Sequence, residues 1–262
     1  MSTSGSMSVT SSASSVLEVS IAGGVARLSL NRPEKRNALN GELLAALLLA
    51  LDDAEKNADV KVVVLNASQP AAFCVGADLS GAKDLAQAAA EQKLYAELLK
   101  RIRTYSKTTV ALVEGLCLGG GLGVALACDL VYASKSAVFG TPEVQIGLYP
   151  LMISPLIYEN CKSRKRADQI ILSGGKLSAD EAFDVGFATA VAADSEFRGF
   201  SEEKLAQLLK ADSAAIVFGK KAVRDASALP FESEIDTLCG SLGELLSKPQ
   251  TRARIAAFLA KG

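Results

Sequence analysis

The pattern of apolar and polar residues predicts a chain in which β-strands and helices alternate. Residues 16–21 and 25–30 alternate apolar with polar positions on either side of a glycine pair, which predicts a β-hairpin. Residues 42–56 are strongly helical in pattern, and residues 60–65 (VKVVVL) form a continuous apolar run of strand length. Such a run is typical of a buried parallel strand, so the pattern indicates the α/β class.

The same order of strand and helix returns farther along the chain. Residues 66–83 are too long for an ordinary connection and predict a functional loop, which an amphipathic helix over about residues 82–105 follows. Residues 109–114 predict a second buried strand. It leads through the glycine run at residues 119–121 into an apolar helix over residues 122–128.

The second half of the chain is mostly helical. Short strands are expected at residues 130–133 and 137–139, and Thr141 followed by Pro142 predicts a capped helical turn. Residues 178–181 (SADE) read as a capping box that starts a helix.

Composition narrows the chemistry. The chain has 262 residues, of which 49% are hydrophobic and 22% charged, so it can bury a full-sized core. It contains no histidine, which excludes Ser-His-Asp and Cys-His hydrolases and histidine-containing zinc sites. Any reaction here must use carboxylates, amines, phenols, thiols or backbone amides.

Charge and cysteine content bear on partners and compartment. The 28 basic and 29 acidic residues nearly balance, so no nucleic-acid partner is expected. The five cysteines are scattered without a Cys-x-x-Cys pair, which indicates reduced thiols. The sequence shows no signal peptide or transmembrane segment, and we expect an intracellular protein of the cytoplasm or an organelle matrix, without a membrane partner.

The glycine run is the first candidate for chemistry. Three adjacent glycines between a strand and a helix let a ligand approach backbone N–H groups at the positive end of the helix dipole. A dinucleotide fingerprint would need glycine where Val124 or Leu126 stands, so that reading fails. The other reading is that the glycines only permit close packing of helix and strand.

The second candidate is the stretch AFCVGADL at residues 72–79, inside the predicted functional loop. A loop carried out from a parallel strand can present its own N–H to a ligand shared with the glycine turn. Two such donors would form an oxyanion hole, in which loss of one donor costs about 10²–10³ in rate. Taken alone, the loop could equally be structural.

Four stretches together resemble one family. They are NRPEKRNAL at residues 31–39, AFCVGADL, the glycine-centred stretch at residues 115–129, and FGTPE at residues 139–143. In order and spacing they look like the crotonase superfamily, the enoyl-CoA hydratase/isomerase family. Together the GAD and triple-glycine motifs are specific, although each alone is not.

The resemblance implies a fold and a ligand. The fold would be a crotonase-like spiral of repeated ββα units over residues 16–200, with a C-terminal helical trimerisation region at residues 201–262. Residues 1–15 are mostly Ser, Thr, Gly and Met, and this composition predicts a disordered tail. The ligand would be an acyl-CoA thioester, and no separate cofactor or metal would be needed because coenzyme A is part of the substrate. A homotrimer or a hexamer formed from two trimers would be expected.

The resemblance also assigns roles to residues. The amide N–H groups of Ala77 and Gly120 would bind the thioester oxygen and stabilise an enolate, with Glu143 as general acid and base. Substrate contacts would lie at Lys35, Arg36, Ala38, Ala77, Asp78, Leu79, Ser80 and Gly120. Lys35 and Arg36 could instead be solvated charges after a turn.

One departure from the family bears on the reaction. Active hydratases of the family have two glutamates, and here the first position is Gly123. A single carboxylate can move a proton between two carbons, as in the family's Δ3,Δ2-enoyl-CoA isomerases. Hydration stays open, because Tyr149, Asp78 or Ser80 could supply the missing contact, and a Gly123→Glu variant would test whether the rest of a two-carboxylate site is in place.

Two further readings also stay open. The same site could serve another CoA-thioester lyase, a decarboxylase or a hydrolase. Alternatively, the chain could be a non-catalytic CoA-binding member of the family. The bulky residues 147–155 replace a stretch that is usually glycine-rich, so the acyl pocket is expected to have a bulky lining.

Overall fold

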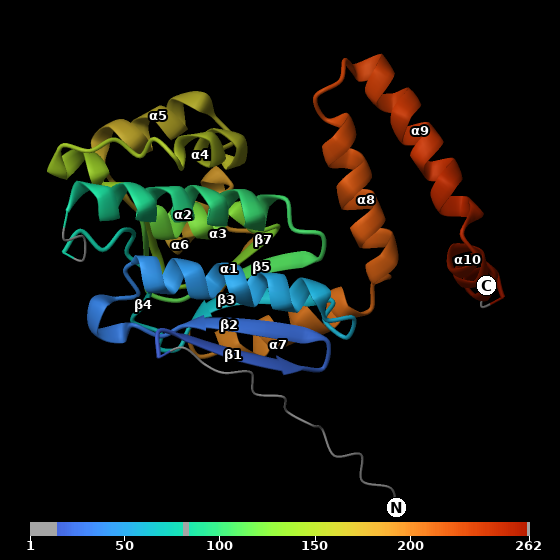
Figure 1. The fold of residues 1–262 in the computed structure, drawn as a ribbon, viewed down its shortest axis with the longest axis horizontal. Coiled ribbons are helices and arrows are strands. Elements are labelled where there is room, and N and C mark those ends of the chain that lie inside the picture. The colour runs from blue at the N-terminus through green and yellow to red at the C-terminus, as the bar shows by residue number, and fades with distance from the viewer. Residues whose placement is uncertain (1–14, 81–83, 261–262) are drawn as a thin grey trace, which may run out of the picture. The chain divides into compact units, whose positions relative to one another are not determined.

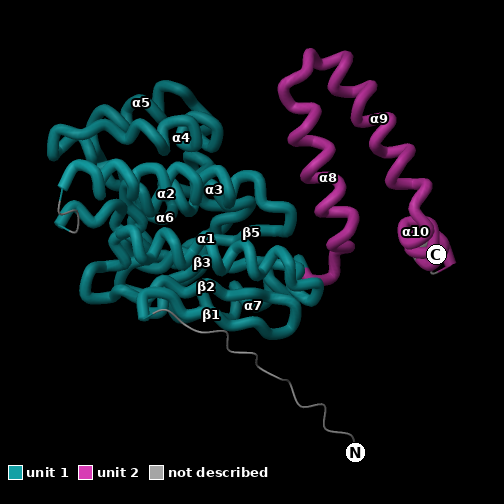
Figure 2. The backbone as a smooth tube through the Cα atoms, viewed as in Figure 1, with its two compact units in different colours: residues 1–208 teal, residues 209–262 magenta. Residues whose placement is uncertain are grey.

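The computed structural model describes residues 15–80 and 84–260, and the chain divides into two compact units, residues 1–208 and 209–262 (Figure 2). The tail expected over residues 1–15 lies outside the described residues except for its last position. The boundary expected after residue 200 falls inside a helix, α7 (Phe197–Leu209), at whose end the two units meet in sequence.

A six-stranded sheet forms the base of the first unit (Figure 1). Its strands, in spatial order, are β1 (Leu17–Ala22), β2 (Val25–Leu30), β3 (Val62–Ala67), β5 (Thr108–Val113), β7 (Leu130–Ser134) and β10 (Ala190–Ala192). The first pair is the expected antiparallel hairpin, and every later pair is parallel. The continuous apolar run is therefore a buried parallel strand, as predicted, because both faces of such a sheet are covered.

A second, smaller sheet was not predicted from the pattern. Its strands, in spatial order, are β4 (Ala72–Cys74), β6 (Leu116–Leu118), β8 (Val138–Gly140) and β9 (Lys176–Ser178). The strands β4, β6 and β8 run parallel, and β9 is antiparallel to β8. Thus β3 and β4, β5 and β6, and β7 and β8 each give one strand to each sheet, and this is the repeating unit of the spiral.

Helices connect the repeats. Within the first unit they are η1 (Pro33–Lys35), α1 (Gly41–Lys56), α2 (Leu85–Arg103), α3 (Gly120–Ala127), η2 (Pro142–Ile146), α4 (Ser154–Asn160), α5 (Arg164–Ser173), α6 (Ala179–Val185) and α7. Asn40 begins α1 by accepting a hydrogen bond from the Leu43 N–H, and Leu43, Leu47 and Leu51 then recur every four residues on its buried face.

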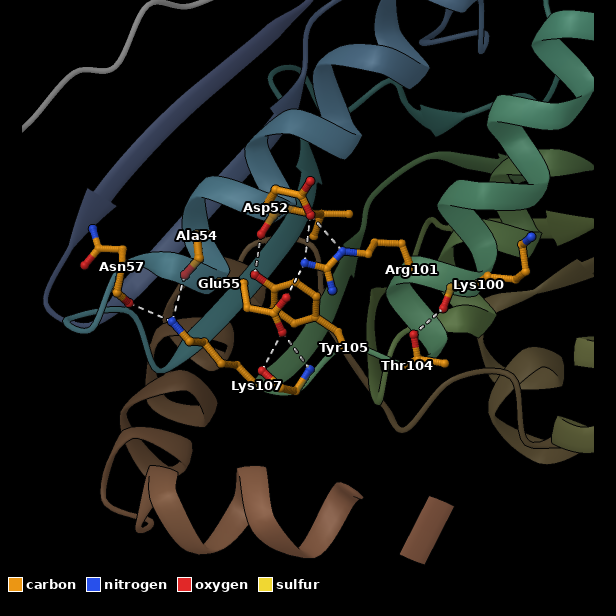
Figure 3. Close-up of polar contacts among 11 residues, drawn as sticks. Asp52, Ala54, Glu55, Asn57, Lys100, Arg101, Thr104, Tyr105 and Lys107 are labelled. Carbon is orange, nitrogen blue, oxygen red and sulfur yellow. Dashed lines mark hydrogen bonds and ion pairs between the residues drawn. The ribbon is translucent and has the colours of Figure 1, made fainter. Parts of the chain in front are cut away.

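The parallel helices α1 and α2 are joined at their C-terminal ends by a polar network (Figure 3). The Arg101 guanidinium on α2 pairs with Asp52 at 2.8 Å and with Glu55, both on α1, and lies over the Tyr105 ring. The Tyr105 hydroxyl donates to the Leu51 carbonyl at 2.7 Å. These contacts lie at and just beyond the C-terminal end of α2, whereas the residues of α2 that line the pocket described below belong to its N-terminal and middle turns.

The second half contains two predicted helix starts, and both are found, but only one has a side-chain cap. Ser178 and Glu181 form the predicted capping box of α6. Thr141 stands in front of η2 but does not cap it, because its hydroxyl donates instead to the buried Ile170 carbonyl at 3.0 Å. The expected helical turn is consequently a short 3₁₀ segment that begins with Pro142.

The second unit consists of α8 (Ser213–Ala226), α9 (Phe231–Ser247) and α10 (Pro249–Leu259). The Asp212 side chain caps α8 through the Ala215 N–H and pairs with Arg254 of α10 at 2.5 Å. Phe231, Ile235 and Leu242 of α9 are at least half exposed in the single chain. The expected trimer or hexamer stays a prediction. No helix in the described part of the chain is long and apolar enough to cross a membrane.

Candidate functional site

Three candidate residues follow the ends of three neighbouring strands. Ala77 comes three residues after β4, Gly120 two residues after β6, and Glu143 three residues after β8. Because β4, β6 and β8 are adjacent and parallel, their carboxyl ends meet at one edge of the small sheet. This edge is where ligands of α/β proteins bind, and the three residues meet there.

A pocket with a volume of about 690 Å³ opens at this edge. It is lined by five of the predicted site residues, Ala77, Asp78, Leu79, Gly120 and Glu143, and by neighbours from α1, α2, η2 and the loop that follows η2. Lys35, Arg36, Ala38 and Ser80 are not among its lining residues. In the described ranges, no three cysteine, aspartate or glutamate side chains gather in a cluster that could hold a metal ion.

A short bridge to Leu39 sets the direction of the Ala77 amide. The Leu39 N–H donates to the Gly76 carbonyl at 2.7 Å, and the Asp78 N–H donates to the Leu39 carbonyl at 2.8 Å. In an extended chain, peptide groups point alternately to opposite sides. The Ala77 N–H therefore points away from Leu39, and Ala77 lies in the pocket wall.

The Gly120 amide lies at the start of a helix. Gly119 precedes α3 with φ +52°, a conformation that favours glycine, and Gly120 is the first helical residue. Its N–H is among the first four of the helix, which have no intrahelical acceptor, and it lies at the positive end of the helix dipole. A β-carbon placed on Gly76 would lie 3.0 Å from the Gly120 nitrogen, so the two loops approach closely.

The glycine run also permits close packing of α3 against the small sheet, and this applies at Gly121. A β-carbon on Gly121 would overlap the Cys74 carbonyl of β4, so a side chain there would separate α3 from the small sheet. Close packing thus accounts for Gly121, while Gly120 faces the pocket. Cys74 itself is fully buried, which raises the pKa of its thiol to about 12, and it packs as a small apolar residue.

Glu143 brings a carboxyl group to the same place. It lies in the first turn of η2, and its Oε1 is 3.0 Å from the position of a β-carbon on Gly119. Its Oε2 is buried and has no hydrogen-bond partner among the described residues. Burial raises the pKa of this carboxyl above its ordinary value.

The space beside Gly123 is already filled. A β-carbon built on Gly123 would overlap both the Tyr95 hydroxyl oxygen and the Ile153 Cγ2. A Gly123→Glu variant therefore cannot test the remainder of a two-carboxylate site, because the new side chain has to displace these groups. Sequence reasoning missed Tyr95, which in the pattern is one more apolar position on the buried stripe of a helix.

Asp78, Ser80 and Tyr149 are the residues that could replace the contact of the missing glutamate, and they differ in the contacts that they already make. Asp78 pairs with Arg32 at 2.9 Å, and it accepts a hydrogen bond from the Ser80 hydroxyl at 2.7 Å. Ser80 and then Arg32 hold the pKa of the Asp78 carboxyl below its ordinary value. Tyr149 lines the pocket from the loop after η2 and is 43% exposed.

The substrate contacts expected near the N-terminus of α1 lie in two environments. Lys35 and Arg36 are exposed at the end of η1, whereas Ala38 is buried in the core. The far wall of the pocket is the bulky lining expected from the sequence. It includes Leu148, Tyr149, Leu151 and Met152 from the bulky stretch, next to Ile146 of η2, and these side chains are 43–74% exposed.

A spiral of ββα units, with two glycine-bearing loops and one buried carboxyl at the ends of adjacent strands, defines a protein of the crotonase superfamily. The sequence profile of the enoyl-CoA hydratase/isomerase family matches residues 20–262, and the chain belongs to this family.

Individual relatives agree with this assignment. The chain is 29% identical over 247 residues to the short-chain-enoyl-CoA hydratase of Clostridium acetobutylicum, covering 91% of this chain and 92% of that one. It is 28% identical over 234 residues to the 2,3-dehydroadipyl-CoA hydratase of Escherichia coli, covering 89% and 91%. The crystal structure of an enoyl-CoA hydratase of Mycobacterium smegmatis superimposes with a TM-score of 0.88 at 26% identity, covering 94% and 96%.

Proposed function

We propose that the chain is an acyl-CoA enzyme that forms an enolate of its thioester substrate. The Ala77 and Gly120 amides bind the thioester oxygen, and Glu143 is the single general acid and base. The observation that carries this proposal is the buried Glu143 Oε2, which has no partner among the described residues and lies in the pocket that both amides line. A buried carboxyl without a partner is costly for stability, so a role in the reaction accounts for it.

The proposed site suits enolate chemistry physically. When a base removes a proton from the α-carbon of a thioester, negative charge develops on the thioester oxygen. Two fixed N–H donors and the dipole of α3 stabilise that charge without reorganising. Neither an imidazole nor a metal ion takes part in these steps, which agrees with a chain that contains no histidine.

A shift of the double bond is the reaction we favour. The Glu143 carboxylate takes a proton from C2 of a 3-enoyl-CoA, and the resulting dienolate is held by the two amides. The protonated Glu143 then returns the proton to C4, which leaves a 2-enoyl-CoA. One carboxylate completes this cycle, and the filled space at Gly123 leaves no room for a second.

Hydration is the second candidate, and the relatives favour it. Two relatives that match nearly the full chain are named as hydratases, of short-chain enoyl-CoA and of 2,3-dehydroadipyl-CoA. Here Glu143 would take a proton from water while the oxygen adds to C3, and it would then deliver that proton to C2. This route needs water to be held without a second carboxylate.

Coenzyme A contacts outside the pocket are part of the proposal. Lys35 and Arg36 are exposed, and they lie in the segment that leads to Leu39, a lining residue of the pocket. We propose that these cations meet the phosphates of coenzyme A, while the apolar loop after η2 contacts the acyl group.

The test is an incubation with 2-enoyl-, 3-enoyl- and 3-hydroxyacyl-CoA thioesters in heavy water, followed by mass spectrometry. Hydration adds heavy water, and lyase, decarboxylase or hydrolase reactions change the mass in other ways. Isomerisation by return of the same proton leaves the mass unchanged, so it is followed by the absorbance of the conjugated 2-enoyl thioester. Glu143→Gln should lose about 10²–10⁴-fold in turnover. The control is Glu114→Gln, because burial also raises the pKa of Glu114, which lies outside the pocket lining.

Two outcomes would contradict the proposal. Full turnover in Glu143→Gln would remove that residue from the reaction. Binding of acyl-CoA by calorimetry, with neither deuterium exchange nor product after long incubation of the wild-type chain, would make the protein a non-catalytic CoA-binding member of the family.

A further inference from the structure

Tyr95 reaches from α2 to the start of α3. Its hydroxyl donates a hydrogen bond to the Gly120 carbonyl at 2.8 Å, and the residue is only 8% exposed while lining the pocket. The bond joins a long helix to the residue whose N–H faces the pocket. Tyr95 therefore contacts the residue that is the proposed oxyanion donor and also lines the pocket.

Gly120 lies in a segment where no side chain of its own can hold the backbone in place. Three consecutive glycines begin α3, and glycine has access to more backbone conformations than any other residue. Gly119 has no side chain with which to cap the helix. The peptide group that carries the Gly120 N–H is held from inside the helix by the Gly123 N–H, which donates to the Gly119 carbonyl at 3.1 Å. The Tyr95 hydrogen bond to the Gly120 carbonyl holds the next peptide group from α2.

The Tyr95 hydroxyl is itself held in place. Ile153 and Tyr95 together fill the space that a side chain on Gly123 would occupy, and a β-carbon on Gly120 would lie 3.4 Å from the Tyr95 hydroxyl oxygen. Burial, with smaller contributions from Cys74 and Glu143, raises the pKa of Tyr95 well above its ordinary value. The hydroxyl consequently stays protonated and remains a hydrogen-bond donor.

We propose that Tyr95 is a positioning residue of the acyl-CoA site: its hydroxyl fixes Gly120, so that the Gly120 N–H points at the thioester oxygen, and it closes the Gly123 side of the reaction centre. This inference rests on the proposed function, because it assigns to Gly120 the role of oxyanion donor. It adds that the tyrosine on α2 takes the room where a second carboxylate would stand. Glu143 is thereby left as the sole acid and base.

The test compares two tyrosines that make the same kind of bond. Tyr95→Phe removes the donor to Gly120 and keeps the ring. Tyr105→Phe removes a buried donor to the Leu51 carbonyl at 2.7 Å, outside the pocket lining, and is the matched control. Turnover, KM and deuterium exchange at the α-carbon are measured for both, together with the binding of acetoacetyl-CoA, whose bound enolate is followed by its absorbance.

We expect Tyr95→Phe to lose about tenfold to hundredfold in turnover and in enolate formation with little change in KM, because the donor is misplaced for the transition state. Tyr105→Phe should keep wild-type turnover. Amide hydrogen exchange at residues 119–122 should rise in Tyr95→Phe only. If Tyr95→Phe does not fold, 4-aminophenylalanine at position 95 keeps the ring and an N–H donor and should retain activity.

The outcomes separate the two proposals. If the wild-type chain neither exchanges the α-proton nor binds acetoacetyl-CoA as an enolate, the proposed function fails. If it does both, and Tyr95→Phe matches Tyr105→Phe in turnover and in exchange at residues 119–122, Tyr95 has no positioning role. Loss of activity with 4-aminophenylalanine in a folded protein would overturn the inference as well.

Discussion

The Arg32 guanidinium and the Asp78 carboxylate form an ion pair of 2.9 Å in which the two side chains are only 11% and 7% exposed. Arg32 also donates to the Ala38 carbonyl, and the next residue, Leu39, forms the bridge to the segment that carries Ala77. The pair thus joins the segment that follows the hairpin to the loop that presents the Ala77 amide.

Removal of Arg32 should destabilise the protein and displace this loop. In Arg32→Ala the Asp78 charge stays buried without its partner, for which we expect a loss of about 3–5 kcal/mol in the free energy of unfolding. Arg103→Ala is the control, because its pair with Glu159 is half exposed and should contribute less than about 1 kcal/mol. Urea unfolding measures both, and equal losses would contradict a special role for the buried pair.

Substitution of Gly123 should be costly for a steric reason. The new methyl group of Gly123→Ala overlaps Tyr95 and Ile153, and overpacking of this kind costs about 1–3 kcal/mol. Gly123→Glu should cost more and gain no hydratase activity. Gly199→Ala in α7 is the control, since a β-carbon there meets no described atom within 4 Å and alanine favours the helix by about 1 kcal/mol. A stable, hydrating Gly123→Glu variant would contradict the filled space.

Elements with a strong local pattern could be predicted from the sequence. The hairpin, the buried strands β3 and β5, the helices α1 and α2 and the capping box at Ser178 are specified by periodicity or by residues within a turn of one another. The strands β4, β6 and β9 could not, because three residues are too few to show a period of two.

Because these short strands could not be predicted, the sequence pattern alone could not bring the site residues together. The meeting of Ala77, Gly120 and Glu143 depends on the pairing of β4 with β6 and of β6 with β8, so from the sequence it rested on the family resemblance. Tyr95 carries no local signal, because an aromatic residue on the apolar stripe of a helix is ordinary core. Only the placement of α2 against α3 shows that its hydroxyl reaches Gly120.

Turnover should depend on pH through Glu143. The first step needs the ionised carboxylate, and burial raises the pKa of this group. Activity should therefore fall as the pH decreases through that raised pKa, at a higher pH than an ordinary glutamate would give. The pH at which turnover falls is measured from the pH profile of kcat. Glu114→Gln is the control and should keep the wild-type profile. A profile that is flat down to the ordinary range of a glutamate would contradict it.

Glu143→Gln should stabilise the protein at neutral pH while it lowers turnover. In the unfolded chain Glu143 ionises near its ordinary pKa, and in the folded chain it ionises only at higher pH because the group is buried. Between these values the folded state binds more protons, so the free energy of unfolding of the wild type decreases as the pH rises through this window. Glutamine carries no charge and escapes this loss. The advantage of the variant should consequently appear as the pH rises through the window, stay constant above it and vanish below the ordinary pKa.

Asp78→Asn is the control, because the pKa of Asp78 is shifted in the opposite direction to that of Glu143. Ser80 and Arg32 lower the pKa of Asp78, so its contribution to stability is present above its unfolded pKa and is lost as the pH falls through the folded value. Asp78→Asn should thus be destabilising at neutral pH, and less so in acid. Urea unfolding of both variants and the wild type across pH 3–8 measures the two trends. If Glu143→Gln lowers the free energy of unfolding at neutral pH, the carboxylate has a stabilising partner in the folded protein, which contradicts a pKa raised by burial.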